Sequence, residues 1–343
     1  MEHRDPITKF FAAEGLAKAG DKGGIHVLLA AVDLMDDLTL RRRAVLALGQ
    51  LGDERSFDRL INLSSEHGHA LQDSAAEAIG RIGSSDNKEQ ILQTLLRLAD
   101  GEGSASERAQ IGLRWLDAPE GWDKLRELAT KRNDSTKVIA IQQLGYDDDP
   151  ASRDLLLKMI QTNKAFAEFA LTSAKRSLGE DSIEPEMAWI KTESAGNKPD
   201  VSIRVLDRIF EIATPQQILE VLGECSEKFR TDLIKHLLAL DPLPVEVAAE
   251  SVNHSNAVVV EASASIIGRS GNSKHAKSLT KPLAHWLGVG TELDAEMTFK
   301  NKYSDEKFND CESCLKRLIW AAGVLGGNAV SYTHLTLPTI LLV

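Results

Sequence analysis

The sequence is poor in aromatic residues, poor in cysteine and free of long apolar runs. Phe, Trp and Tyr together make up 5% of the 343 residues, as expected where closely stacked helices pack through Ala, Leu, Ile and Val instead. The three cysteines do not suggest a disulfide framework and fit a reducing cytoplasm. No stretch approaches 18 apolar residues, and the charged start of the chain does not resemble a signal peptide. We therefore expect a cytoplasmic protein without a membrane span.

Positive charge and catalytic motifs are also scarce. The chain has 40 Lys and Arg against 51 Asp and Glu, a net charge of −11, which disfavours a protein that coats nucleic acid through a clustered basic surface. No Gly-rich phosphate loop, nucleophile elbow or His-Glu-x-x-His is present. The single Cys311-Glu-Ser-Cys314 supplies two ligands where a structural zinc site needs four. We expect no enzyme activity, no cofactor and no metal.

What the sequence does contain is a phrase that recurs along the chain: an apolar run, then Leu-Gly or Leu-Asp, then a tight turn. It is Ala-Leu-Gly-Gln-Leu-Gly-Asp at 47–53, Ala-Ile-Gly-Arg-Ile-Gly at 78–83 and Leu-Arg-Trp-Leu-Asp at 113–117. The helix ends at Leu51, Ile82 and Leu116 are separated by 31 and 34 residues. A period near 30 with two helices per unit predicts an all-α fold, an α-solenoid.

Each unit divides into a first helix, helix A, and a second helix, helix B. In the clearest pair, helix A covers about 53–64 and places Phe57 and Leu60 on one apolar stripe. Helix B covers about 70–82, carries small residues that let a neighbour approach, and is followed by Gly83, where a left-handed residue is wanted. Other helix B segments are predicted near 5–19, 39–51, 105–116, 134–144, 165–178, 200–212, 228–240, 256–269 and 312–325.

These features resemble the HEAT-repeat family, in particular its bacterial, PBS-lyase-type members. The pattern Asp-Pro-x-x-[Arg/Lys]-x-x-Ala-Ala-x-Ala-Leu-x-x-x-Gly-Asp is matched by Asp5-Pro6, Lys9, Ala12-Ala13 and Gly20-Asp21 in the first unit. The resemblance covers residues 1–327, is weaker from 182 onward, and implies an armadillo-like right-handed superhelix of about nine to ten helix pairs. Such a motif specifies fold and says little of function.

Two segments depart from the repeat pattern. The interval from Ser270 to Leu325 is too long for one unit, and a loop insertion at about 288–310 is expected there. Residues 331–343 resemble a translated sequencing adapter and are interpreted as a non-native tail. In that case the chain is a fragment of a longer natural protein. A short natural tail is the alternative.

Trp115, beside Arg114 and Asp117, could imitate the base-stacking site of HEAT-like DNA glycosylases. The spacing is too generic for those residues to be carried over, and core packing is the expected role of Trp115. The remaining tryptophans are also predicted to pack within the fold, namely Trp122, Trp189, Trp286 and Trp320.

Charge is distributed unevenly between the helices. The predicted helix B segments sum to +6, which leaves −17 for the rest of the chain. In HEAT proteins helix B lines the concave face, so the resemblance implies a mildly basic inner surface on an acidic body. The residues predicted to bind a partner there are Arg41, Arg42, Arg81, Arg114, Arg176, Arg208 and Arg269.

Together these observations predict a non-enzymatic scaffold that binds a protein partner, one with an acidic segment, through its concave face. The first alternative is nucleic-acid binding through the same surface, with steep salt dependence. The second is that the chain is the HEAT-repeat portion of a larger, lyase-like protein. The identity of the partner and the oligomeric state do not follow from the sequence.

Overall fold

In the part of the chain that the structure describes, the secondary structure is helical and contains no strand. The computed structural model describes residues 5–66, 68, 70–83, 86–131, 135–162, 165–179, 182–192, 199–291 and 305–325, without the side chains of Pro199 and of 287–312. The chain divides into two compact units, Met1–Pro185 (unit 1) and Glu186–Val343 (unit 2). The division lies in the segment whose sequence is irregular.

Unit 1 is a stack of helix pairs. Its helix B elements are α1 (Pro6–Lys18), α3 (Leu38–Leu51), α5 (Gln72–Ile82), α7 (Gly103–Leu116), α9 (Ser135–Leu144) and α11 (Ala167–Leu178). Its helix A elements are α2 (Ile25–Leu34), α4 (Phe57–Ser65), α6 (Lys88–Ala99), α8 (Pro119–Lys131) and α10 (Pro150–Thr162). Short 3-10 helices at Lys22–Gly24 and Glu54–Ser56 lead into α2 and α4.

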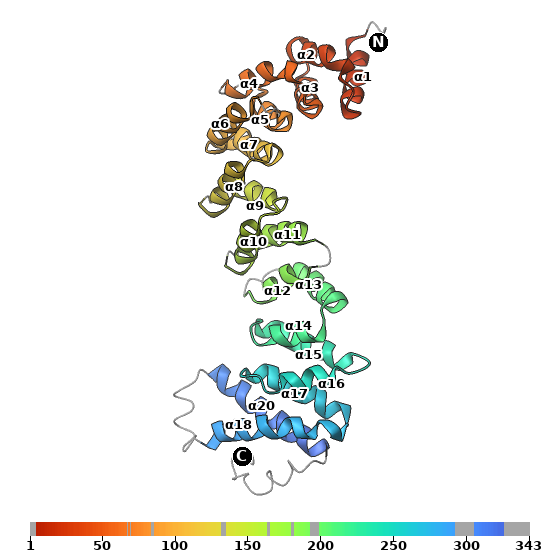
Figure 1. The fold of residues 1–343 in the computed structure, drawn as a ribbon, viewed down its shortest axis with the longest axis vertical. Coiled ribbons are helices and arrows are strands. Elements are labelled where there is room, and N and C mark those ends of the chain that lie inside the picture. Colours follow the sequence, from red (N-terminus) through yellow and green to blue (C-terminus); the bar gives the residue numbers. More distant parts are fainter. Residues whose placement is uncertain are drawn as a thin grey trace. The chain divides into compact units, whose positions relative to one another are not determined.

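The helices of unit 1 form two layers (Figure 1). Each odd-numbered helix packs on the next odd-numbered helix, and each even-numbered helix packs against the odd-numbered helix that follows it. We call the odd-numbered layer of unit 1 layer B and the even-numbered layer A. The helix B elements of the sequence pattern therefore stand side by side along one surface.

Local sequence explains where these helices begin and end. The Asp5 carboxylate accepts hydrogen bonds from the backbone N–H groups of Ile7 and Thr8 at 3.3 and 2.8 Å, and Pro6 follows at the first helical position. Gly83 ends α5 with φ of 52°, in the left-handed region, as the pattern predicts. Asp117 ends α7 in the same region, with φ of 51°.

Layer B is close-packed because glycines lie where its helices meet. A Cβ atom added to Gly80 in α5 would overlap the backbone of Gly112 in α7, and one added to Gly112 would come within 2.6 Å of the Ala76 carbonyl oxygen. Gly49 in α3 meets Ala78 in α5 in the same way. These contacts leave no room for a side chain, so the long residues beside them must extend along the surface.

Unit 2 contains α12 (Glu184–Ile190, which begins just before the division), α13 (Pro199–Ile212), α14 (Pro215–Leu222), α15 (Glu227–Ala239), α16 (Val245–Ser251), α17 (Ala257–Ser270), α18 (Thr280–Thr291) and α20 (Asp305–Val324). A 3-10 helix at Ser273–Leu279 precedes α18. Thr214 and Gln217 form a reciprocal capping box at the start of α14. Helix α17 packs against α14, α15, α16 and α20, so it is the centre of this unit.

The predicted helix B segments agree with the observed helices to within three residues, apart from the start of the last. That helix begins at Asp305 rather than near 312, and α18 extends to Thr291, so both helices reach into the expected insertion at 288–310. Residues 292–304 of that insertion and the whole predicted tail at 331–343 lie outside the described residues. The fold is an all-α solenoid, as the repeat pattern predicts.

Candidate functional site

Five side chains at the helix ends of layer B form a continuous row in which arginines and aromatic rings alternate. The order is Arg81, Trp115, Arg114, Tyr146 and Arg176, and we call this set the cation–aromatic ladder. Arg81 is in the last turn of α5, Arg114 and Trp115 are in the last turn of α7, Tyr146 follows α9, and Arg176 is in the last turn of α11.

The ladder is tightly stacked. The guanidinium carbons of Arg81 and Arg114 lie 4.5 and 4.2 Å from the centre of the Trp115 ring. Those of Arg114 and Arg176 lie 4.0 and 4.3 Å from the centre of the Tyr146 ring. All four distances are well inside the range of about 6 Å over which a cation is attracted to a ring face. Each ring therefore has two guanidinium groups over it.

The ladder is also accessible. Trp115 is 43% exposed and Tyr146 is 48% exposed. The prediction that Trp115 belongs to the core is therefore wrong. A ring at the end of α7 projects past the helix contacts, and its stacking on arginine replaces burial. Trp320 is likewise 42% exposed, contrary to the prediction, whereas Trp122, Trp189 and Trp286 are buried.

Helix geometry explains why arginine is found at these positions. The carbonyl groups of a last helical turn carry partial negative charge, which favours a cation there. Arg81 also donates to Glu77, one turn earlier in α5, at 2.7 Å. Arg176 donates to the backbone carbonyl of Gln142 at 3.3 Å. These hydrogen bonds and the stacked rings together hold the guanidinium planes in place.

The positive charge of the ladder is only partly compensated within the described residues. Glu77 is buried and is shared between Arg81 and Arg108, with Arg108 at 2.6 Å. Arg114 and Arg176 have no carboxylate partner among the residues that the structure describes. Two of the three ladder arginines are thus available to an anion from outside.

Three aspartates follow Tyr146 in the sequence, and arginines of layer A bind all of them. Arg126 in α8 lies 2.8 Å from Asp147 and 3.7 Å from Asp149. Arg153 in α10 lies 3.8 Å from Asp148. These carboxylates are therefore not free to neutralise Arg114 and Arg176.

Arg43, near the start of layer B, shows what a compensated arginine looks like. Its guanidinium carbon lies 5.1 Å from the centre of the Phe11 ring, but its Nε and Nη2 donate to Glu14 at 2.9 and 2.5 Å. Hydrogen bonding from Arg43 lowers the pKa of Glu14, so that carboxylate stays ionised. Arg43 has the ring but no spare charge.

The other predicted arginines do not join the ladder. Arg41 donates through Nε to the carbonyl of Val32 at 2.7 Å, and Arg42 donates to the carbonyl of Ala70 at 3.3 Å and lies 3.8 Å from Asp73. In unit 2, Arg208 lies 3.7 Å from Glu211, while Arg269 lines a hollow beside the end of α15. Sequence reasoning missed Tyr146. Its signal was its spacing, 31 residues after Trp115 and 30 before Arg176, close to one repeat each.

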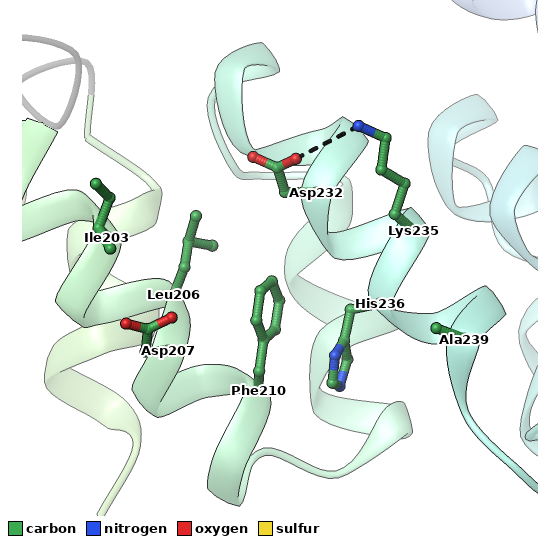
Figure 2. A pocket seen from close by; sticks show the side chains of 8 residues that line it. All are labelled: Ile203, Leu206, Asp207, Phe210, Asp232, Lys235, His236 and Ala239. Atoms are coloured by element: carbon green, nitrogen blue, oxygen red, sulfur yellow. Dashed lines mark ion pairs between the residues drawn. The ribbon is translucent and has the colours of Figure 1, made fainter.

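Unit 2 has a surface hollow of a different kind, of about 390 Å³, between α13 and α15. Figure 2 shows Ile203, Leu206 and Phe210 of α13 facing His236 and Ala239 of α15. Two aspartates and a lysine complete the lining: Asp207, Asp232 and Lys235. The hollow is mostly apolar and has carboxylates on both walls.

His236 is stacked on Phe210 in this hollow, with ring centres 4.3 Å apart and an angle of 8° between the planes. Burial lowers the pKa of His236 below its ordinary value. Lys235 lies 3.8 Å from Asp232 (Figure 2). At neutral pH the floor of the hollow is therefore uncharged.

The cysteines offer no nucleophile among the described side chains. Burial raises the pKa of Cys225 to about 11, so the thiol stays protonated at neutral pH. Cys314 is buried, and the side chain of Cys311 lies outside the description. Within the described part of the chain no group of three or more His, Cys, Asp and Glu side chains is arranged to hold a metal ion. Asp117 accepts a hydrogen bond from the Trp122 indole at 2.8 Å, a structural role.

A membrane span is likewise not found: within the described residues, no helix is both long and apolar enough to cross a bilayer.

Comparison with known proteins identifies the repeats at the start of the chain. Residues 1–80 match the family model of HEAT repeats. None of the curated proteins matches the chain. Among solved structures, an engineered protein of known crystal structure is 15% identical and aligns over 98% of this chain and 93% of its own, with a TM-score of 0.34. A TM-score this low carries no argument about fold or function.

Proposed function

Residues 1–80 belong to the HEAT-repeat family, and on that premise we propose that the protein is a non-enzymatic scaffold that binds a protein partner through layer B of unit 1. The partner carries an acidic segment, and its recognition site is the cation–aromatic ladder. A cytoplasmic location is part of the same proposal, because it follows from the use of cysteine in the sequence.

The observation that carries this proposal is the pair of ladder arginines without a carboxylate partner, stacked on rings that are nearly half exposed. Arginine and aromatic residues are enriched in the central contacts of protein interfaces. Fixed guanidinium groups lose little conformational entropy when a carboxylate binds. The row therefore suits recognition of a negatively charged polypeptide.

Nucleic acid is the alternative ligand for a basic surface, and the ladder suits it less well. Proteins that bind single strands stack successive bases on free aromatic faces. Both ladder rings already have two guanidinium groups over them. A base could stack only after displacing an arginine.

The test is affinity capture from lysate with the tagged full chain, with and without nuclease, at low and moderate salt. The decisive variant is Arg114→Glu with Arg176→Glu, because neither residue has a carboxylate partner to leave unpaired among the described residues. The matched control is Arg97→Glu with Lys158→Glu. These exposed residues of α6 and α10 have no printed ion pair either, and the change in charge is the same.

A protein identified by mass spectrometry that survives nuclease, is lost with the ladder variant and is kept by the control supports the proposal. Recovery of nucleic acid that is lost at moderate salt would replace it with the alternative. A partner kept by both variants would place the binding surface elsewhere.

A further inference from the structure

The ladder has a spacing as well as a charge, and the spacing restricts the kind of acidic segment that fits. Neighbouring guanidinium groups share one ring between them, so the Arg81–Arg114 and Arg114–Arg176 separations are each at most about 9 Å, from two ring distances apiece. The steps are nearly equal. The three cations therefore form an even row rather than a cluster.

An even row of single cations favours separate carboxylates over one highly charged group. Phosphate groups are held where several donors converge on the same oxygens. In the ladder a ring separates each guanidinium from the next, so converging on one group would require the stacking to break. Carboxylates that lie one after another along a chain can each meet one arginine.

An extended polypeptide supplies carboxylates at this spacing. In an extended chain every second side chain points to the same face, about 7 Å from the previous one, which lies within the 9 Å limit once side-chain reach is included. A helix presents side chains on one face at alternating steps of three and four residues. We infer that the ladder binds an extended acidic segment with carboxylates at alternate residues. This inference rests on the proposed function.

The experiment measures fluorescence anisotropy of labelled synthetic probes with the full chain at low salt. The first probe is a peptide of repeated Glu-Ser dipeptides, in which alternate residues are acidic. The second is a helical Ala-rich peptide with the same number of glutamates on one face. The third is an oligothymidylate of equal charge. We expect the Glu-Ser peptide to bind at least about fivefold more tightly than either of the other probes.

Two substitutions connect that binding to the ladder. Arg114→Gln is expected to weaken the Glu-Ser peptide about fivefold or more, whereas Arg97→Gln in layer A leaves it unchanged. Arg114→Lys keeps the charge but not the planar stack, and is expected to fall between them. Thermal melts of the variants confirm that each is folded. A Trp115→Phe variant identifies which part of any fluorescence change comes from the ladder.

The inference is overturned if the helical peptide or the oligothymidylate binds as tightly as the Glu-Ser peptide. Absence of Glu-Ser binding at low salt, or binding indifferent to Arg114→Gln, overturns it as well. The proposed function stands or falls separately. Capture of a ladder-dependent protein whose binding region has no alternating acidic segment would keep the scaffold and reject the extended segment.

Discussion

The ladder of unit 1 and the hollow of unit 2 occupy helix B elements of the same repeat pattern, yet they have different chemistry. In unit 1, α5 and α7 meet at Gly80 and Gly112, and the long side chains beside that contact are stacked together. In unit 2, α13 and α15 contain no glycine, and a hollow of about 390 Å³ lies between them. The comparison indicates that small residues at a helix contact decide whether neighbouring side chains stack or leave a groove.

The strongest way to break this comparison is to remove the close contact in unit 1. Gly80→Val places a branched side chain against the backbone of Gly112, and we expect a loss of about 3 kcal/mol in the free energy of unfolding. Urea unfolding followed by circular dichroism measures it. Separation of α5 from α7 should also abolish ladder-dependent binding.

The matched control for Gly80→Val is Gly15→Ala in α1, where an added Cβ meets nothing within 4 Å. There we expect a gain of about 0.5–1 kcal/mol, because alanine favours a helix over glycine. If Gly80→Val were as stable as the unmodified chain, the helix contact described above would be wrong.

A smaller effect is expected from removing one ring of the ladder. Trp115→Ala removes the cation–π contacts of Arg81 and Arg114 with this ring, which at exposed sites contribute about 0.5–1 kcal/mol each. The expected loss in the free energy of unfolding is about 1–2 kcal/mol. Trp115→Phe, which keeps a ring, should lose less than half of that. Equal losses for the two variants would show that the stacking adds no stability.

The smallest effect sharpens the unit 2 side of the comparison. Because burial lowers the pKa of His236, the unfolded chain binds this proton more readily than the folded one. The contribution of His236 is therefore complete above its unfolded pKa of about 6.5 and decreases as the pH falls below it. We expect the stability difference between the unmodified chain and His236→Gln to shrink by less than about 1 kcal/mol from pH 7.5 to 5.5.

His275, which lines the other hollow of unit 2, provides the control for that measurement. The His275→Gln variant should follow the pH dependence of the unmodified chain. A stability difference that grows as the pH falls would mean that the folded protein favours protonated His236, which the burial of this ring contradicts.

Much of the fold could be predicted because each repeat is specified locally. The apolar stripe at Phe57 and Leu60, the cap at Asp5 and the left-handed Gly83 are read from short segments, and all three are observed. Sequence alone also identified Arg81, Arg114 and Arg176 as surface cations of helix B. It could not show that Tyr146 joins them, because that depends on which side chains meet across four stacked helices.

By itself the sequence determined the solenoid, because a period near 30 residues with two helices per unit buries its apolar faces only by stacking neighbours. It also determined that positive charge gathers on helix B. Only the tertiary structure decided which of seven arginines have rings on both sides or carboxylates beside them. Stacking distances and compensation of charge are properties of residues about 30 positions apart, and the helix packing that brings them together is not written in any one repeat.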